Sequence, residues 1–442
     1  MNGNVKLLGM VATASIMLAS CSNDELKEVY KGEKISFTTQ VKTRAIETTN
    51  SNLEGFYVYA DADNYEDMFI DGQLAKKQKG TDNSFTITDE NGSDYLWPTG
   101  VNEVRFWTYG PHNLNTEKDF KPSINTHAQQ FDVLLESSME NGGTAQQDFI
   151  VAYQNVKQED VRGGAVKLDF HHALSQICIT AKCPDDDNRK VKIRGAWLVN
   201  INQKGNLSFS EKAAETYQMQ WEASLPSNFG VKLGDISLSK ASTTLIGQSE
   251  GTVGEKSSSL MLIPQTVGKW NKDNSKGAYI LFLCRIEAIH KGTFHQDTDE
   301  GGNEAIKNKA IKVEGDYHYH QLFPTPTSDT WSDDEYGYTC VGIDVDWKPN
   351  HKYVYNVMFC GPGSGAGVYP PTELPETLPK YDDIKIVPNE DESKVGTTVL
   401  DSPLSFEVTV DGWQNGNTGD DDGNTNICLL YTSPSPRDTE RS

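Results

Sequence analysis

The sequence is poor in positive charge. Its 442 residues include 40 Lys and Arg against 63 Asp and Glu, which gives a formal net charge of −23. Such an acidic surface repels phosphate backbones, so nucleic acid is excluded as a partner. Cysteine is also scarce, with seven residues and no C-x-x-C pair, so neither a disulfide framework nor a zinc site of the usual spacing is expected. Hydrophobic residues make up only 36% of the chain, which excludes a polytopic membrane protein.

The sequence instead contains short runs rich in Val, Ile, Tyr and Phe, separated by many of its 37 Gly and 18 Pro. Such runs, with few helical stretches between them, predict β-strands in sandwiches built by long-range pairing. The strands are expected at residues 35–41, 55–60, 104–109, 164–170, 175–180, 191–201, 207–210, 260–265, 278–286, 341–347, 353–359 and 404–410. A turn is expected at Gly205, an insertion near 287–340 and a Gly/Pro-rich linker at 361–379. Because the chain is too long for one hydrophobic core, the sequence predicts an all-β protein with two folded units that meet near residue 185.

The first residues form a targeting segment. Lys6 precedes an apolar run at 7–19 that is too short to span a bilayer as a helix of the mature protein. The end of this run, Leu18-Ala19-Ser20-Cys21, resembles the lipobox of bacterial lipoproteins. The resemblance implies that residues 1–21 are a signal peptide and that Cys21 is acylated. An ordinary secretion signal with a chance cysteine is the alternative.

The last residues are expected to have a different origin from the rest. Residues 428–442 resemble one reading frame of a transposase sequencing adapter, and we expect them to be a sequencing artefact. A natural tail rich in Pro and Ser is the alternative.

Several groups of polar residues have the composition of a functional site but not its spacing. His318 and His320 alternate on one strand and would form a metal-binding pair, but no third ligand follows at a diagnostic distance, so we expect a solvated face. The Gly-rich stretch 361–367 follows a strand as a dinucleotide loop does, but the prolines at 370–371 forbid the helix that such a loop must open. The spacing of Asp61, Asp63 and Asp67 resembles the start of a calcium-binding loop, but Glu66 lies at the position where such a loop requires glycine. We therefore expect no metal, no cofactor and no enzyme.

Motifs of one family follow one another along the chain. They are residues 35–37 with 43–45, then 55–60, 95–98, 170–177, 262–265 and 347–349 leading to 353–355. In this order, behind a lipoprotein signal, they resemble the fimbrillin family of Bacteroidales surface pili over nearly the whole mature chain. The insertion, the linker and the C-terminal segment depart from the family pattern.

The resemblance implies a fold and an assembly mechanism. The fold would be two tandem β-sandwich domains with transthyretin-like topology, at 22–185 and 186–427. In the mechanism, a protease removes the first strand after an Arg, and a strand from a neighbouring subunit replaces it. Arg44 and Ala45 are the expected scissile pair, and a solvated loop residue is the alternative for Arg44. The removable strand would place its alternate side chains in the core, namely Ile35, Phe37, Thr39 and Val41.

The sequence therefore predicts a structural subunit of a cell-surface fimbria that contributes to adhesion. Its expected partners are other subunits by strand exchange, the outer membrane through the lipid before maturation, and a host or bacterial surface receptor. The alternative is a non-polymerising adhesin or glycan-binding lipoprotein, whose candidate contact residues are Trp270, Trp331, Tyr317 and Tyr319. A glycan hydrolase is disfavoured, because acids are so numerous that carboxylate pairs arise by chance.

Overall fold

The protein is built from β-strands. The computed structural model describes residues 33–41, 48, 50–81, 83–142, 146–161, 164–209, 219–247, 259–292, 311–400, 402–412 and 429–431. These residues contain no α-helix, and so none that could cross a membrane, but they include short 3₁₀ segments such as η1 (Gln158–Val161) and η3 (Glu392–Lys394). The predicted all-β class is confirmed.

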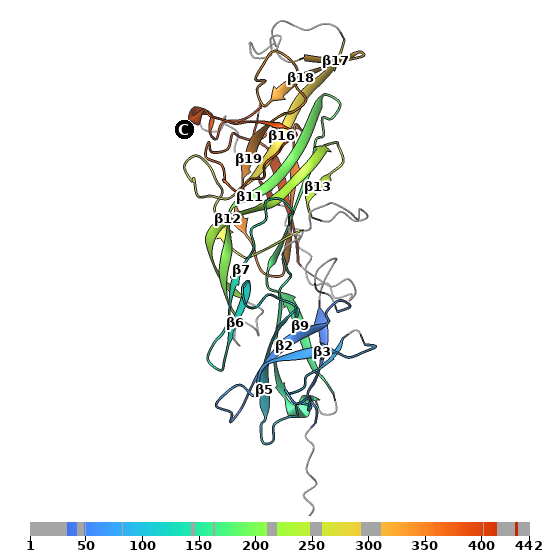
Figure 1. Cartoon of the computed structure of the whole chain (residues 1–442), viewed down its shortest axis with the longest axis vertical. Helices are drawn as coiled ribbons and strands as arrows, with labels where there is room; N and C mark the ends of the chain where they lie inside the picture. The colour runs from blue at the N-terminus through green and yellow to red at the C-terminus, as the bar shows by residue number, and fades with distance from the viewer. Residues whose placement is uncertain are drawn as a thin grey trace, which may run out of the picture.

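A closed barrel occupies one end of the molecule (Figure 1). Within the described part its strands follow the order β1-β4-β3-β2-β5-β8-β9. They are β1 (Ser36–Val41), β2 (Gly55–Ala62), β3 (Ile70–Lys77), β4 (Ser84–Thr86), β5 (Glu103–Gly110), β8 (Ile150–Lys157) and β9 (Val166–His172). Alternate residues of these strands point inward, as the period of a strand requires, and form a core rich in phenylalanine.

The rest of the described chain forms two larger sheets and a short pair. The first sheet contains β10 (Ser175–Lys182), β13 (Thr243–Ile246), β14 (Leu260–Leu262), β21 (His351–Met358), β23 (Ser405–Gly412) and β24 (Leu429–Tyr431). The second contains β6 (Phe120–Ile124), β7 (Gln129–Leu134), β11 (Arg189–Ser208), β12 (Gln220–Ser237), β16 (Tyr279–Lys291), β17 (Ile311–Glu314), β18 (Tyr317–Phe323), β19 (Glu335–Gly342) and β22 (Lys385–Val387). The short pair is β15 (Thr266–Val267) with β20 (Val345–Asp346). Figure 1 places β17 and β18 at the end farthest from the barrel.

Strands from early and late parts of the sequence share these sheets. β7 pairs with the end of β11, where Phe131 lies opposite Leu207, and β10 runs parallel to β21. The outer side of the barrel also belongs to the larger core, because Tyr109 of β5 packs edge-on against Phe131 at 5.1 Å between ring centroids. The barrel and the sheets therefore pack against each other directly. The tandem β-sandwich arrangement, the domain limits at 22–185 and 186–427 and the transthyretin-like topology stay predictions.

Two sequence expectations change in this region. The turn expected at Gly205 is wrong, because Gly205 lies inside β11 opposite Ala223. A Cβ at this position would lie 3.0 Å from side-chain atoms of Ile263 and Trp221, so glycine permits a close approach and not a turn. The expected insertion near 287–340 contains most of β17–β19. β18 and β19 both pair with the edge of β16 that faces away from β11, and β17 extends the sheet beyond β18.

Candidate functional site

The predicted site residues fall into two groups. Cys21, Arg44 and Ala45 lie outside the described residues, so lipidation and cleavage stay predictions. Ile35, Phe37, Thr39 and Val41 lie on or next to β1, and the strand predicted over 35–41 is confirmed.

β1 closes the barrel by pairing on both of its edges. It runs antiparallel to β4, with Phe37 opposite Phe85, and parallel to β9, with Phe37–Val41 beside Val166–Phe170. Sheet edges that lose a partner expose unpaired N–H and C=O groups, which favour the addition of another strand. The described barrel without β1 would have two such edges, one on β4 and one on β9.

The inward side chains of β1 complete the barrel core. Ile35 and Phe37 are fully buried, and Thr39 is 4% exposed. The Phe37 ring packs edge-on against Phe106 at 5.6 Å and against Phe56 at 5.9 Å between centroids. The period-2 pattern of the sequence therefore predicted the burial of these three residues correctly. For Val41 the structure gives the register alone, opposite Phe170.

Hydrogen bonds hold the start of this segment. The Ile35 N–H donates to the Tyr95 carbonyl at 2.8 Å, and the Trp97 N–H donates to the Glu33 carbonyl at 2.9 Å. Lys34 also forms a surface ion pair with Asp94 at 2.7 Å. Exposed pairs of this kind contribute at most about 1 kcal/mol, so the buried side chains and the strand pairing provide most of the binding of β1.

A second anchor lies just beyond the predicted cleavage site. The Thr48 N–H donates to Asp148 Oδ2 at 2.9 Å, and Asp148 Oδ1 lies 2.8 Å from His172 Nδ1. Burial raises the pKa of Asp148, but the His172 imidazole and the Thr48 hydrogen bonds outweigh it and keep the pKa below its usual value. The carboxylate therefore stays charged and holds the chain at Thr48. Sequence reasoning missed this anchor, because its three residues are distant in the chain.

The candidate metal sites look different in three dimensions. His318 and His320 are buried, at 7% and 9% exposure, so the expected solvated face is wrong. The cause is pairing with β16, where His290 lies opposite His318 and its Nε2 lies 2.9 Å from His320 Nε2. Among the described residues, no group of three or more His, Cys, Asp or Glu has an arrangement that could hold a metal ion.

The other two candidate loops have structural explanations. Asp61 and Asp63 face Arg105, whose Nη2 lies 2.6 Å from Asp61 Oδ2 and 3.8 Å from Asp63 Oδ1. The stretch 361–367 forms a tight turn in which the N–H groups of Gly361 and Ser364 bond to each other's carbonyls, and no helix follows within 361–379. Asp61 therefore forms a close ion pair with Arg105, and the turn at 361–367 lacks a helix N-terminus that could bind phosphate.

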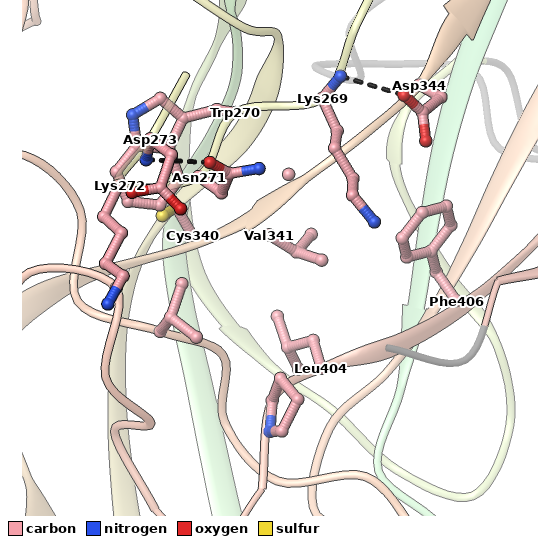
Figure 2. A pocket seen from close by; sticks show the side chains of 14 residues that line it. Lys269, Trp270, Asn271, Lys272, Asp273, Cys340, Val341, Asp344, Leu404 and Phe406 are labelled. Atoms are coloured by element: carbon pink, nitrogen blue, oxygen red, sulfur yellow. Dashed lines mark hydrogen bonds between the residues drawn. The ribbon is translucent and has the colours of Figure 1, made fainter. Parts of the chain in front are cut away.

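A pocket of about 300 Å³ lies beside the end of β19 (Figure 2). Its walls combine apolar side chains, including Val341, Leu404 and Phe406, with the polar Lys269. The Lys269 N–H donates to Asp344 Oδ1 at 2.9 Å, which fixes the loop that forms one wall. The side chains labelled in Figure 2 include no histidine, serine or threonine, and burial raises the pKa of the labelled Cys340 thiol well above its usual value.

The aromatic residues considered for ligand contact are mostly covered. Trp270 is 5% exposed and packs against Tyr279 at 5.5 Å between ring centroids. Trp331 lies under the Arg285 guanidinium, 4.8 Å from the ring centroid. Tyr317 is 40% exposed and carries Lys291 over its ring at 4.8 Å. Of these three aromatic residues, Tyr317 is the most exposed, although Lys291 covers one face of its ring.

The fold and the site define an all-β protein whose own first strand completes its barrel. The family model described as fimbrillin-like matches residues 43–362, and the chain belongs to this family. The match begins just after β1, so the fit of β1 to the barrel is an observation from the structure alone.

The chain is similar to solved structures at low sequence identity. A fimbrial protein from Bacteroides vulgatus ATCC 8482 is 14% identical with a TM-score of 0.51, over 86% of this chain and 99% of that one. A candidate cell adhesion protein from Bacteroides ovatus ATCC 8483 is 15% identical with a TM-score of 0.40, over 74% and 92% of the two chains. A comparison with curated proteins gave no match. The first likeness supports the fold.

Proposed function

We propose that the protein is a structural subunit of a cell-surface fimbria, and not an enzyme, that joins other subunits by exchanging β1 for one of their strands. The observation that carries this proposal is the position of β1, which is paired on both edges and supplies Ile35, Phe37 and Thr39 to the barrel core. The expected scissile pair, Arg44 and Ala45, immediately follows this strand.

Removal of β1 would create a specific acceptor groove. The groove would run between β4 and β9, and the side chains that contact Phe37 would form its floor. Burial of apolar surface contributes about 25 cal/mol per Å², so the exposed apolar floor of the groove would favour the binding of a new strand. That strand must place apolar side chains at alternate positions and run parallel to β9 to reproduce the native pairing.

The anchor at Thr48 defines how much of the chain would leave. Cleavage after Arg44 separates residues 1–44 from a chain that Asp148 holds at Thr48. The lipid on Cys21 would leave with β1, because Cys21 precedes the cut by 44 − 21 = 23 residues. One cut would therefore release the subunit from the outer membrane and open its groove.

The test uses the purified chain and an Arg-specific protease. We expect the product to begin at Ala45 and, after the released fragment is removed at mild denaturant concentration, to bind a fluorescent peptide of residues 33–41. A peptide with Phe37→Lys should not bind, and Arg44→Ala protein should neither release β1 nor bind peptide. With a partner subunit present, the cleaved protein should form ladders that resist SDS without boiling. The proposal fails if cleaved protein keeps residues 35–41 permanently, or if the Arg44→Ala protein polymerises equally well.

A surface adhesin that does not polymerise is the second candidate. The observation that favours it is Tyr317, which is 40% exposed on the β17–β18 hairpin at the end of the molecule opposite the barrel. Binding to immobilised glycans that is lost in Tyr317→Ala, by protein that fails to polymerise after cleavage, would support this candidate.

A further inference from the structure

Two cysteines that are distant in sequence meet where β10 and β21 end. β10 and β21 run parallel, with Lys182 beside Met358, and the Phe359 N–H donates to the Lys182 carbonyl at 2.9 Å. Cys183 is the next residue after β10, and Cys360 lies two residues beyond β21. The chain after Cys360 also passes close to Pro184, since a Cβ on Gly361 would lie 3.1 Å from Pro184 Cγ.

The strand pairing brings the two thiols close enough to influence each other's ionisation. Hydrogen bonding with the Cys360 thiol lowers the pKa of Cys183 below that of an ordinary thiol, and the same hydrogen bond together with burial raises the pKa of Cys360. Cys183 is fully buried and Cys360 is partly exposed, so a small reagent has access at Cys360. Cys360 also has φ = +50°, a region that few residues other than glycine adopt, so the backbone conformation does not favour a cysteine at this position.

We propose that Cys183 and Cys360 are a modification site that forms an intramolecular disulfide when the protein meets a disulfide oxidant of low molecular mass. Cys360 exchanges with the oxidant R–S–S–R, which gives a mixed disulfide and one R–SH. The Cys183 thiolate then attacks the Cys360 sulfur and releases the second R–S⁻ group, which takes the remaining proton. The two cysteine sulfurs lose two electrons in total, and the oxidant gains them.

The bond would cross-link the sheet where β10 and β21 end. It would join the end of β10 to the turn after β21 and close a loop of 360 − 183 = 177 residues. Cross-links across loops this long restrict the unfolded chain strongly, so the oxidised protein should unfold at a higher temperature. Disulfides persist in oxidising compartments. That this protein reaches such a compartment rests on the proposed function, which requires export.

The experiment uses the full chain and does not depend on polymerisation. Reduced protein is incubated with oxidised glutathione, alkylated and digested, and the peptides are identified by mass spectrometry. We expect a reductant-sensitive cross-link between the peptides that contain Cys183 and Cys360, and an increase in Tm of about 5–10 °C. Cys183→Ser and Cys360→Ser should each lose both effects.

Cys178→Ser is the matched control. Cys178 is buried in the same sheet with its sulfur 3.0 Å from Ser259 Oγ, so its loss should leave the cross-link and the increase in Tm intact. If a serine variant does not fold, the comparison of oxidised with reduced wild-type protein still decides the question. Absence of the 183–360 cross-link, or preferential pairing of either cysteine with Cys178, would overturn the proposal, whatever the result of the strand-exchange experiment.

Discussion

Truncation of Phe37 tests whether β1 completes the barrel core. Phe37 is fully buried, and its ring packs edge-on against Phe56 and Phe106. Phe→Ala substitutions in cores cost about 3–5 kcal/mol, of which each aromatic pair provides about 0.5–1.5 kcal/mol. Since a domain is stable by only about 5–15 kcal/mol, Phe37→Ala should leave the barrel marginally stable.

Urea unfolding followed by tryptophan fluorescence provides the measurement. Among the eight tryptophans, Trp97 belongs to the barrel core and lies 6.0 Å from Phe106 between ring centroids, so unfolding of the barrel contributes to the change in emission. With a slope of about 2 kcal/mol/M, the unfolding midpoint should fall by about 1.5–2.5 M. Thr38→Ala is the control, because Thr38 lies on the outer face of the same strand and should cost less than about 1 kcal/mol. Equal shifts for Phe37→Ala and Thr38→Ala would refute the reasoning.

Three further predictions concern the anchor, the backbone packing and the response to acid. Cys21→Ser should leave unprocessed precursor without lipid, and incorporation of labelled palmitate into this variant would contradict the lipobox assignment. Gly230→Ala should lower stability by about 2–4 kcal/mol, since its Cβ would lie 2.3 Å from the Ala196 carbonyl oxygen. A Cβ at Gly234 on the same strand would meet nothing within 4 Å, so Gly234→Ala should change stability by less than about 1 kcal/mol. Thermal melts compare the two variants. Burial raises the pKa of Glu335, but hydrogen bonds from neighbouring side chains and from a backbone N–H outweigh it and lower the pKa to about 2. The ionised Glu335 should therefore stabilise the folded protein by up to about 3 kcal/mol. This contribution should be complete above pH 4.5 and lost as the pH falls toward 2. Glu335→Gln should show a smaller loss of stability than wild type over that range, and parallel pH profiles would be the contrary result.

The sequence predicted the local features of the fold correctly where periodicity is strong. The alternation of Ile35, Phe37 and Thr39 predicted a strand with one buried face, because successive side chains of a strand point to opposite sides. The all-β class followed from many such strands, and the family followed from the resemblance of an ordered set of motifs. The turn expected at Gly205 was wrong, because a glycine that serves close packing has the same sequence signal as one that serves a turn.

The partners of each strand were decided by tertiary structure alone. No local pattern shows that β1 inserts between β4 and β9, that Thr48 binds Asp148 beside His172, or that His290 covers His320. Side-chain period is a property of a few neighbouring residues, whereas pairing depends on how the whole chain buries its apolar surface. The sequence by itself therefore determined that residues 35–41 form a half-buried strand, and only the folded barrel determined that this strand closes it.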